Sequence, residues 1–101
     1  MATVVHVKDK VPNAVYIGRG SEWGNPYRIG PDGTREDVIA KYRVHLWNRL
    51  KHDLTGYELM HRLADLHGKQ LACYCSPQPC HGDVLVRAAA WADDAIHPFA
   101  D

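Results

Sequence analysis

The chain has 101 residues, of which 46% are hydrophobic and 24% charged, and its 12 Lys and Arg balance its 12 Asp and Glu. This composition excludes a disordered chain and predicts a single globular domain over residues 1–101. The balanced charge gives no broad attraction for nucleic acid or an anionic membrane. Neither a membrane span nor a signal peptide is visible, so we expect a cytoplasmic protein with no membrane partner.

The first half of the chain predicts two short strands, a long loop and a helix. β-branched residues are concentrated in residues 4–7 and again in residues 14–17, which is typical of strands. Residues 18–33 are rich in Gly, Pro, Asn and Asp, and a loop of this length is usually functional or mobile. Thr34 is a suitable N-cap, and apolar residues then recur at helical spacing over residues 35–50.

The second half predicts a helix, a buried strand and a third helix. Residues 55–58 have the Thr-x-x-Glu capping pattern, and Gly68 ends the apolar periodicity that follows. Residues 70–75 form the predicted strand, and the third helix is expected to begin near Cys80. Strands separated by helical crossovers favour parallel pairing. We therefore predict a small α/β domain with a mostly parallel sheet, the 70–75 strand inside it, and about three helices.

The three cysteines are an odd number in a chain without an export signal, so we expect them to be reduced, metal-bound or reactive. In an extended segment Cys73 and Cys75 project from the same face, and Cys80 and His81 follow after a proline-rich turn. Thiolates and imidazole are zinc ligands, which makes these four residues a candidate metal site. The adjacent Cys80 and His81 are, however, awkward partners for one tetrahedral ion.

A catalytic interpretation uses Cys80, His81 and Asp83 instead. At a helix start, free N–H groups and the helix dipole would lower the pKa of the Cys80 thiol and make it a nucleophile or an anion-site residue. His81 would act as acid or base, and Asp83 would accept a hydrogen bond at the helix start. We favour this arrangement, with Cys80 alone at the helix N-terminus, over a structural zinc. The third alternative is that all three cysteines are buried apolar residues.

The loop after the second strand begins Gly18-Arg19-Gly20-Ser21, which resembles the start of a phosphate cradle with Arg19 as the anion clamp. It matches neither the P-loop nor the dinucleotide-binding pattern. Trp23 would stack on a base or, equally, anchor the loop in the core, and Arg35 would extend the cationic rim. The candidate ligand-binding residues are Arg19, Gly20, Ser21, Trp23, Asn25 and Arg28.

Three blocks, residues 16–27, 32–36 and 71–85, together closely resemble a small domain-of-unknown-function family of bacteriophages and bacteria. The first block reads YIGRGSEWGNPY and the last LACYCSPQPCHGDVL. The resemblance implies an α/β domain with a nucleotide-sized pocket and, for a phage-encoded chain, a location in the host cytoplasm. The last block also resembles a second uncharacterised α/β family with Cys-His-Arg at a helix start, where Gly82 stands in place of the Arg.

We therefore expect the chain to bind, and as a further step to modify, a nucleotide-like or phosphorylated ligand between residues 19–27 and 75–83. The alternative is a non-enzymatic interaction module, with zinc as a stabilising cofactor, that binds a host protein or nucleic acid. Both an enzyme and a binding protein fit the sequence. The position of the two loops distinguishes the two functions. An enzyme needs Arg19 in the same pocket, and so on the same face of the domain, as Cys80 and His81, whereas a binding module needs one exposed patch.

Overall fold

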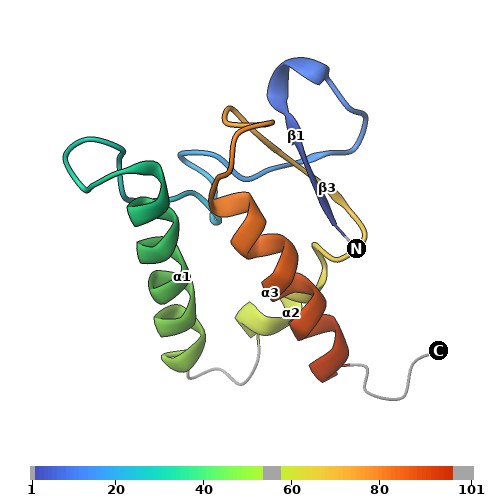
Figure 1. The fold of residues 1–101 in the computed structure, drawn as a ribbon. Helices are drawn as coiled ribbons and strands as arrows, with labels where there is room; N and C mark the ends of the chain where they lie inside the picture. Colours follow the sequence, from blue (N-terminus) through green and yellow to red (C-terminus); the bar gives the residue numbers. More distant parts are fainter. Residues whose placement is uncertain (1, 54–57, 97–101) are drawn as a thin grey trace.

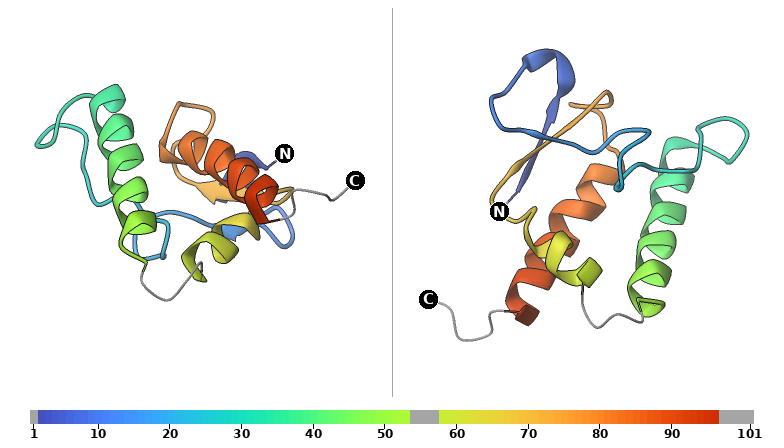
Figure 2. Two further views of the ribbon diagram at one scale, coloured as in Figure 1. Left: turned by 90° about the horizontal axis from the view of Figure 1, so that it is seen from below. Right: turned by 180° about the vertical axis from the view of Figure 1, so that it is seen from behind.

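The computed structural model describes residues 2–53 and 58–96 (Figures 1 and 2). The elements follow in the order β1 (Thr3–His6), the 3-10 helix η1 (Val7–Asp9), β2 (Val15–Tyr16), α1 (Arg35–Lys51), α2 (Glu58–Ala64), β3 (Gln70–Cys73) and α3 (His81–Ile96). Within these ranges the three strands form one sheet accompanied by three α-helices. This is the small α/β fold that the sequence predicts.

The sheet has the strand order β1-β3-β2, and both pairings are parallel. Val5 lies opposite Ala72 in one pairing, and Val15 lies opposite Leu71 in the other. The Ile17 N–H extends the second pairing by donating to the Ala72 carbonyl at 2.9 Å. The expected position of the 70–75 strand inside a parallel sheet is therefore confirmed.

The strand bounds differ from the sequence prediction, and the differences at the ends of β1 and β3 have visible causes. β1 stops at His6 because the chain turns into η1, where His6 Nδ1 accepts from the Lys8 N–H at 3.0 Å and Asp9 accepts from the His6 N–H at 3.3 Å. Val7 therefore belongs to η1 rather than to a strand. β3 ends at Cys73, and Cys75 lies in the bend that follows, so Cys73 and Cys75 do not share one extended segment.

Helix α1 begins at the expected capping residue. Thr34 Oγ1 accepts from the Asp37 N–H at 3.2 Å, and the Asp37 carboxylate accepts from the Thr34 N–H at 2.9 Å. The bond from the Thr34 N–H, followed by one from the Thr34 side chain, lowers the pKa of Asp37 because each favours the ionised carboxylate. The buried positions Val38, Tyr42 and Leu46 recur every four residues along the helix face that meets the core.

Helix α2 begins at Glu58, and residues 55–57 of the predicted capping pattern lie outside the described residues. It packs along α3, and α3 lies between α1 and the strands (Figures 1 and 2). The largest fully buried side chains come from the loop after β2, the three α-helices and β3: Ile17, Tyr42, Leu63, Leu71, Cys73 and Leu85. In the described part of the chain no helix has the length and hydropathy needed to cross a membrane.

The starts of α1 and α3 lie at the same side of the molecule as the carboxyl ends of β1 and β3 (Figure 1). Parallel strands carry their outgoing loops at one edge, and ligands in such sheets usually bind beyond that edge. The positive ends of both helix dipoles are at this side as well. The topology thus brings the loops that carry chemistry to a common end of the fold.

Candidate functional site

A cavity of about 450 Å³ opens at this end of the fold. Its size falls within the range of small-molecule sites. It is lined by residues from the loop after β2, the first turns of α1, the loop after β3 and the start of α3: Tyr16, Gly18, Arg19, Asn25, Tyr27, Arg28, Ile29, Arg35, Val38, Ile39, Cys73, Tyr74, Cys75, Pro79, Cys80 and His81. The expected convergence of Arg19 with Cys80 and His81 is confirmed.

The charge of the cavity lining has one sign. Arg19, Arg28 and Arg35 line it, whereas the described lining contains no Asp or Glu. Arg35 Nη1 donates to the Pro79 carbonyl at 3.0 Å and thereby connects α1 to the loop after β3. In residues 2–53 and 58–96, the guanidinium groups of Arg19 and Arg28 have no hydrogen-bond or ion-pair partner. An overall neutral chain therefore places unpaired positive charge at one cavity.

Trp23 does not line this cavity, contrary to the expected stacking role. Only 5% of the residue is exposed, and it belongs to the hydrophobic core. The Tyr42 hydroxyl donates to the Trp23 carbonyl at 2.8 Å, and the Arg49 guanidinium lies over the indole, 5.6 Å from the ring centre. Burial of the large apolar indole stabilises the fold. Trp23 therefore anchors the loop in the core, which was the alternative interpretation of the sequence.

The other candidates of this loop divide into lining and shaping residues. Gly20, with φ of +87°, and Ser21, whose hydroxyl donates to the Gly18 carbonyl at 2.7 Å, shape the turn and do not line the cavity. Asn25 lines the cavity and shapes it. Its Nδ2 donates to the Val38 carbonyl at 3.1 Å, and its Oδ1 accepts from the Tyr27 N–H at 2.9 Å.

Sequence reasoning missed two aromatic residues and one ion-pair centre. Tyr16 and Tyr74 line the cavity, with their rings 6.4 Å apart and nearly perpendicular. Their positions at the carboxyl ends of two strands were the available signal. Glu22 accepts from Arg62 Nε at 2.7 Å, and its carbonyl accepts from Arg49 Nη1 at 2.9 Å. These partners lie on two helices far along the chain, so no local pattern could reveal them.

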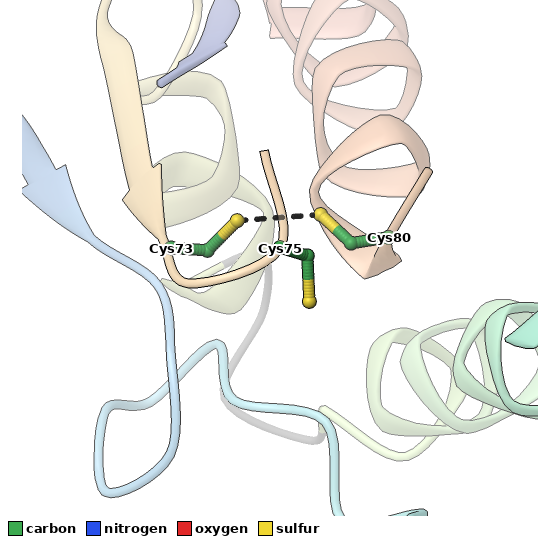
Figure 3. A group of neighbouring side chains, drawn as sticks. All are labelled: Cys73, Cys75 and Cys80. Carbon is green, nitrogen blue, oxygen red and sulfur yellow. Dashed lines mark hydrogen bonds between the residues drawn. The ribbon is translucent and has the colours of Figure 1, made fainter. Parts of the chain in front are cut away.

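The three cysteines converge beside the same cavity (Figure 3). Their Sγ atoms all lie within 4.8 Å of one another, and those of Cys73 and Cys80 are 3.4 Å apart. Cys73 ends the central strand, Cys80 precedes α3, and Cys75 lies in the loop between them, where its carbonyl accepts from the Gln78 N–H at 2.7 Å. Such a group of thiols could hold a metal ion.

The surroundings of Cys80 differ from the prediction. We expected a solitary thiol with a lowered pKa, but burial raises the pKa of Cys80 to about 12. The Gly82 N–H donates to Cys80 Sγ at 3.2 Å and acts in the opposite direction, while Cys73 and Cys75 add to the increase. Desolvation outweighs the helix start here, so the free thiol is not a low-pKa nucleophile.

Gly82 fits the start of α3 because little space is left there. A Cβ atom at this position would lie 2.9 Å from Val4 Cγ2, 3.0 Å from Ile17 Cδ1 and 3.1 Å from Cys80 Sγ. These distances are shorter than ordinary van der Waals contacts. The Arg that the second resembling family has at this place could not be accommodated without movement of the strand residues, so no basic group acts from position 82.

His81 is 7% exposed, and its ring nitrogens do not belong to the close group formed by the three sulfurs, so the predicted fourth metal ligand is not in place. Its Nε2 is 2.7 Å from the Ile17 carbonyl, which can only accept, so Nε2 carries the proton. Burial lowers the pKa of His81, the Ile17 hydrogen bond and Asp83 raise it, and Arg19 lowers it. Nδ1 has no hydrogen-bond partner among the described residues.

Asp83 occupies the position that we expected at the helix start. Its Oδ2 accepts from the Cys80 N–H at 3.2 Å, so it caps α3 from inside the first turn. The residue is exposed and does not line the cavity. Asp83 therefore acts in two ways: it accepts from the backbone at Cys80, and its negative charge raises the pKa of His81.

These features define a small parallel α/β protein with an arginine- and thiol-lined cavity at the carboxyl edge of its sheet. The chain belongs to the family described as Domain of unknown function (DUF4326), whose profile matches residues 4–91. It is also similar to an Enterobacteria phage T4 protein, the "Uncharacterized 12.4 kDa protein in nrdA-td intergenic region", with 39% identity over 72 residues. This match covers 70% of the chain but only 62% of the phage protein. No solved structure matches the chain.

Proposed function

We propose that the chain binds a small phosphorylated ligand of nucleotide size in the cavity. The observation that carries this proposal is the separation of charge: three arginines and no described carboxylate line one cavity of a chain whose net charge is zero. Arg19 and Arg28 are exposed, and charges of one sign around a cavity with apolar walls add up to a field that attracts an anion. Arginine also matches the geometry of a phosphate oxygen pair.

The positions of two helix starts support the same ligand class. Arg35 is the first residue of α1, and Cys80 and His81 form the start of α3, so both positive dipole ends lie at the cavity. The N–H groups of Cys80 and Gly82 already have partners in the Asp83 carboxylate and Cys80 Sγ, so the helix starts contribute partial positive charge rather than free donors. Arg19 and Arg28 are the side chains available to grip a phosphate group, because neither has a partner among the described residues.

The remaining lining suits an aromatic or sugar portion of the ligand. Tyr16, Tyr27 and Tyr74 contribute rings to the cavity, and bases stack on such side chains without sequence-specific hydrogen bonds. His81 is the lining residue suited to exchange a proton with a bound ligand, because burial favours its neutral imidazole and Nδ1 has no hydrogen-bond partner among the described residues. Any modification of the ligand would thus use His81 rather than a Cys80 thiolate.

The test compares nucleotides with the corresponding nucleosides by isothermal titration calorimetry, using chelator-treated protein. We expect nucleoside monophosphates to bind more tightly than the nucleosides. Arg19→Gln should weaken nucleotide binding by roughly 10- to 100-fold, the value of a charged hydrogen bond of about 1.5–3 kcal/mol. The matched control is Arg87→Gln, an exposed α3 arginine outside the cavity lining. Equal affinity for nucleoside and nucleotide, or no effect of Arg19→Gln, would contradict the proposal.

A further inference from the structure

We propose that Cys73, Cys75 and Cys80 bind one zinc ion as three thiolates and leave its fourth coordination position open to the cavity. The proposal concerns the sulfur cluster itself and does not depend on the identity of the ligand that the arginines attract. It assigns a cofactor of stated chemistry, a divalent cation of borderline softness, to three residues that line the cavity but to which the proposed function gives no ligand-binding role.

The spacing of the sulfur atoms fits this ion. Zinc–sulfur bonds of about 2.3 Å at tetrahedral angles place thiolate sulfurs about 3.8 Å apart. Cys73 and Cys80 are already 3.4 Å apart at Sγ, and all three sulfurs lie within 4.8 Å of one another. Changes of a few tenths of an ångström to one ångström would therefore complete three zinc–sulfur bonds, without rearrangement of the strand or the helix.

The secondary structure holds the cysteines close together. Cys73 lies in the central strand, and Cys80 directly precedes a helix of 16 residues, so two ligands are held by regular structure. The Gly82 N–H, which donates to Cys80 Sγ at 3.2 Å, would orient and stabilise that thiolate as an outer-shell partner. Cys75, partly exposed in the loop, is the ligand free to adjust.

The fourth position follows from what surrounds the sulfurs. No His, Asp or Glu of the described residues joins the group, and His81 Nε2 is held by the Ile17 carbonyl. All three cysteines line the cavity, so the vacant side of the ion would face it. Three protein ligands with one open position are typical of catalytic rather than structural zinc, where water or substrate occupies the fourth position. That a phosphate oxygen would occupy it rests on the proposed function.

The test uses protein that has been purified without a metal-affinity step and kept reduced. Zinc content is measured by elemental analysis, and zinc affinity by competition with a chromophoric chelator. Cobalt(II) is then substituted, since its charge-transfer absorption reports thiolate ligands and its visible bands report geometry. We expect one metal ion per chain, thiolate-to-cobalt absorption and tetrahedral bands. Azide, a small anion, should shift the visible bands by entering the open position.

Two variants make the result specific to the cluster. Cys75→Ser, at the partly exposed position, should weaken zinc binding by more than about 100-fold, since even an outer-shell change commonly costs 10- to 100-fold. His61→Ala, at an exposed histidine of α2, should leave it unchanged. Circular dichroism of Cys75→Ser establishes that the variant is folded. Cys73→Ser is a poorer choice, because that side chain is in the core.

Several outcomes would overturn the proposal. These are substoichiometric metal in wild-type protein, binding that Cys75→Ser retains, and loss of two thiols to a Cys73–Cys80 disulfide under reducing purification. Cobalt bands that do not respond to azide would refute the open position. Because all of these measurements omit nucleotide, they are independent of the calorimetric test, which uses metal-free protein. Failure of the zinc site and failure of the phosphate site are therefore distinguishable.

Discussion

The two loops that form the cavity are held in place by different means. The loop after β2 is fixed by hydrogen bonds from side chains to distant backbone, among them Tyr42 to the Trp23 carbonyl and Asn25 to the Val38 carbonyl. The loop after β3 is shorter and has one internal backbone hydrogen bond, from the Gln78 N–H to the Cys75 carbonyl. Near its end, Arg35 Nη1 donates to the Pro79 carbonyl and Asp83 accepts from the Cys80 N–H. Its two ends are joined to each other by the contact between the Cys73 and Cys80 sulfurs.

This difference separates a preformed wall from one that depends on its sulfur atoms. In the loop after β2 the arginines sit on a backbone that α1 holds through buried and half-buried contacts. In the loop after β3, the thiols are at the two ends and in the middle of the segment, so a change in their chemistry changes the shape of the loop. We therefore expect the first wall to be insensitive to metal and redox conditions, and the second to respond to both.

The largest expected effect is that of zinc on the second wall. At free zinc about 100 times its dissociation constant, binding to the folded state should stabilise the protein by about 2.7 kcal/mol. Hydrogen exchange measured by mass spectrometry should slow at residues 74–80 and remain unchanged at residues 21–27. Equal protection of both segments would show that the two walls do not differ in the way that we describe. Chelator should reverse the protection.

The next largest effect concerns the first wall. Tyr42→Phe removes the donor to the buried Trp23 carbonyl, and an unsatisfied buried acceptor costs about 1–3 kcal/mol of unfolding free energy. Urea unfolding of the variant measures this loss. Tyr27→Phe, at a half-buried residue, is the matched control and should change stability by less than about 0.5 kcal/mol. A loss confined to Tyr27→Phe would place the anchor of the loop elsewhere.

A smaller net effect is expected at Gly82. Ala is the better helix former by about 1 kcal/mol, but overpacking against Val4, Ile17 and Cys80 costs about 1–3 kcal/mol. Gly82→Ala should therefore destabilise the protein by about 1 kcal/mol and weaken cobalt binding, because the new methyl group displaces Cys80 Sγ. Asp94→Ala, at an exposed α3 position, provides the control and should be neutral for both measurements.

The smallest effect is a pH dependence at the start of α1. Hydrogen bonds from Thr34 lower the pKa of Asp37 in the folded protein, so the ionised carboxylate contributes stability at pH values above its ordinary pKa of 3.8. This contribution is lost as pH falls through the lowered folded pKa. Thermal melting between about pH 6 and pH 3 should show a smaller acid-induced decrease for Asp37→Asn than for wild type. The same decrease in both proteins would contradict the assignment.

The regular elements of the fold were predictable because their signals are local. The capping residue Thr34 and the apolar spacing of Val38, Tyr42 and Leu46 predicted α1 to within one residue at its end. The helical crossovers between strands favoured parallel pairing, and the parallel sheet is confirmed. The end of β3 was placed too late, at Cys75, because the bend after Cys73 leaves no mark in an apolar run.

The site was predictable only in part, because it depends on contacts between distant segments. That Arg19 and Cys80 share a cavity followed from both loops leaving the same sheet edge. The burial of Trp23 was left as an equal alternative, since Tyr42, which holds it, is 19 residues away. The pKa of Cys80 was predicted in the wrong direction, because the helix start was visible in the sequence and the burial around it was not.

The start of α3 has an evolutionary consequence. Each of the four residues from Cys80 to Asp83 meets its own constraint. Cys80 contacts the Cys73 sulfur, and His81 is hydrogen-bonded to the Ile17 carbonyl. Gly82 occupies a space too small for a Cβ atom, and Asp83 accepts from the Cys80 N–H. Few substitutions are neutral at four adjacent positions that each satisfy a separate constraint. In members of the family that keep the sulfur cluster, we expect these positions to change together or not at all, while the exposed face of α3 varies freely.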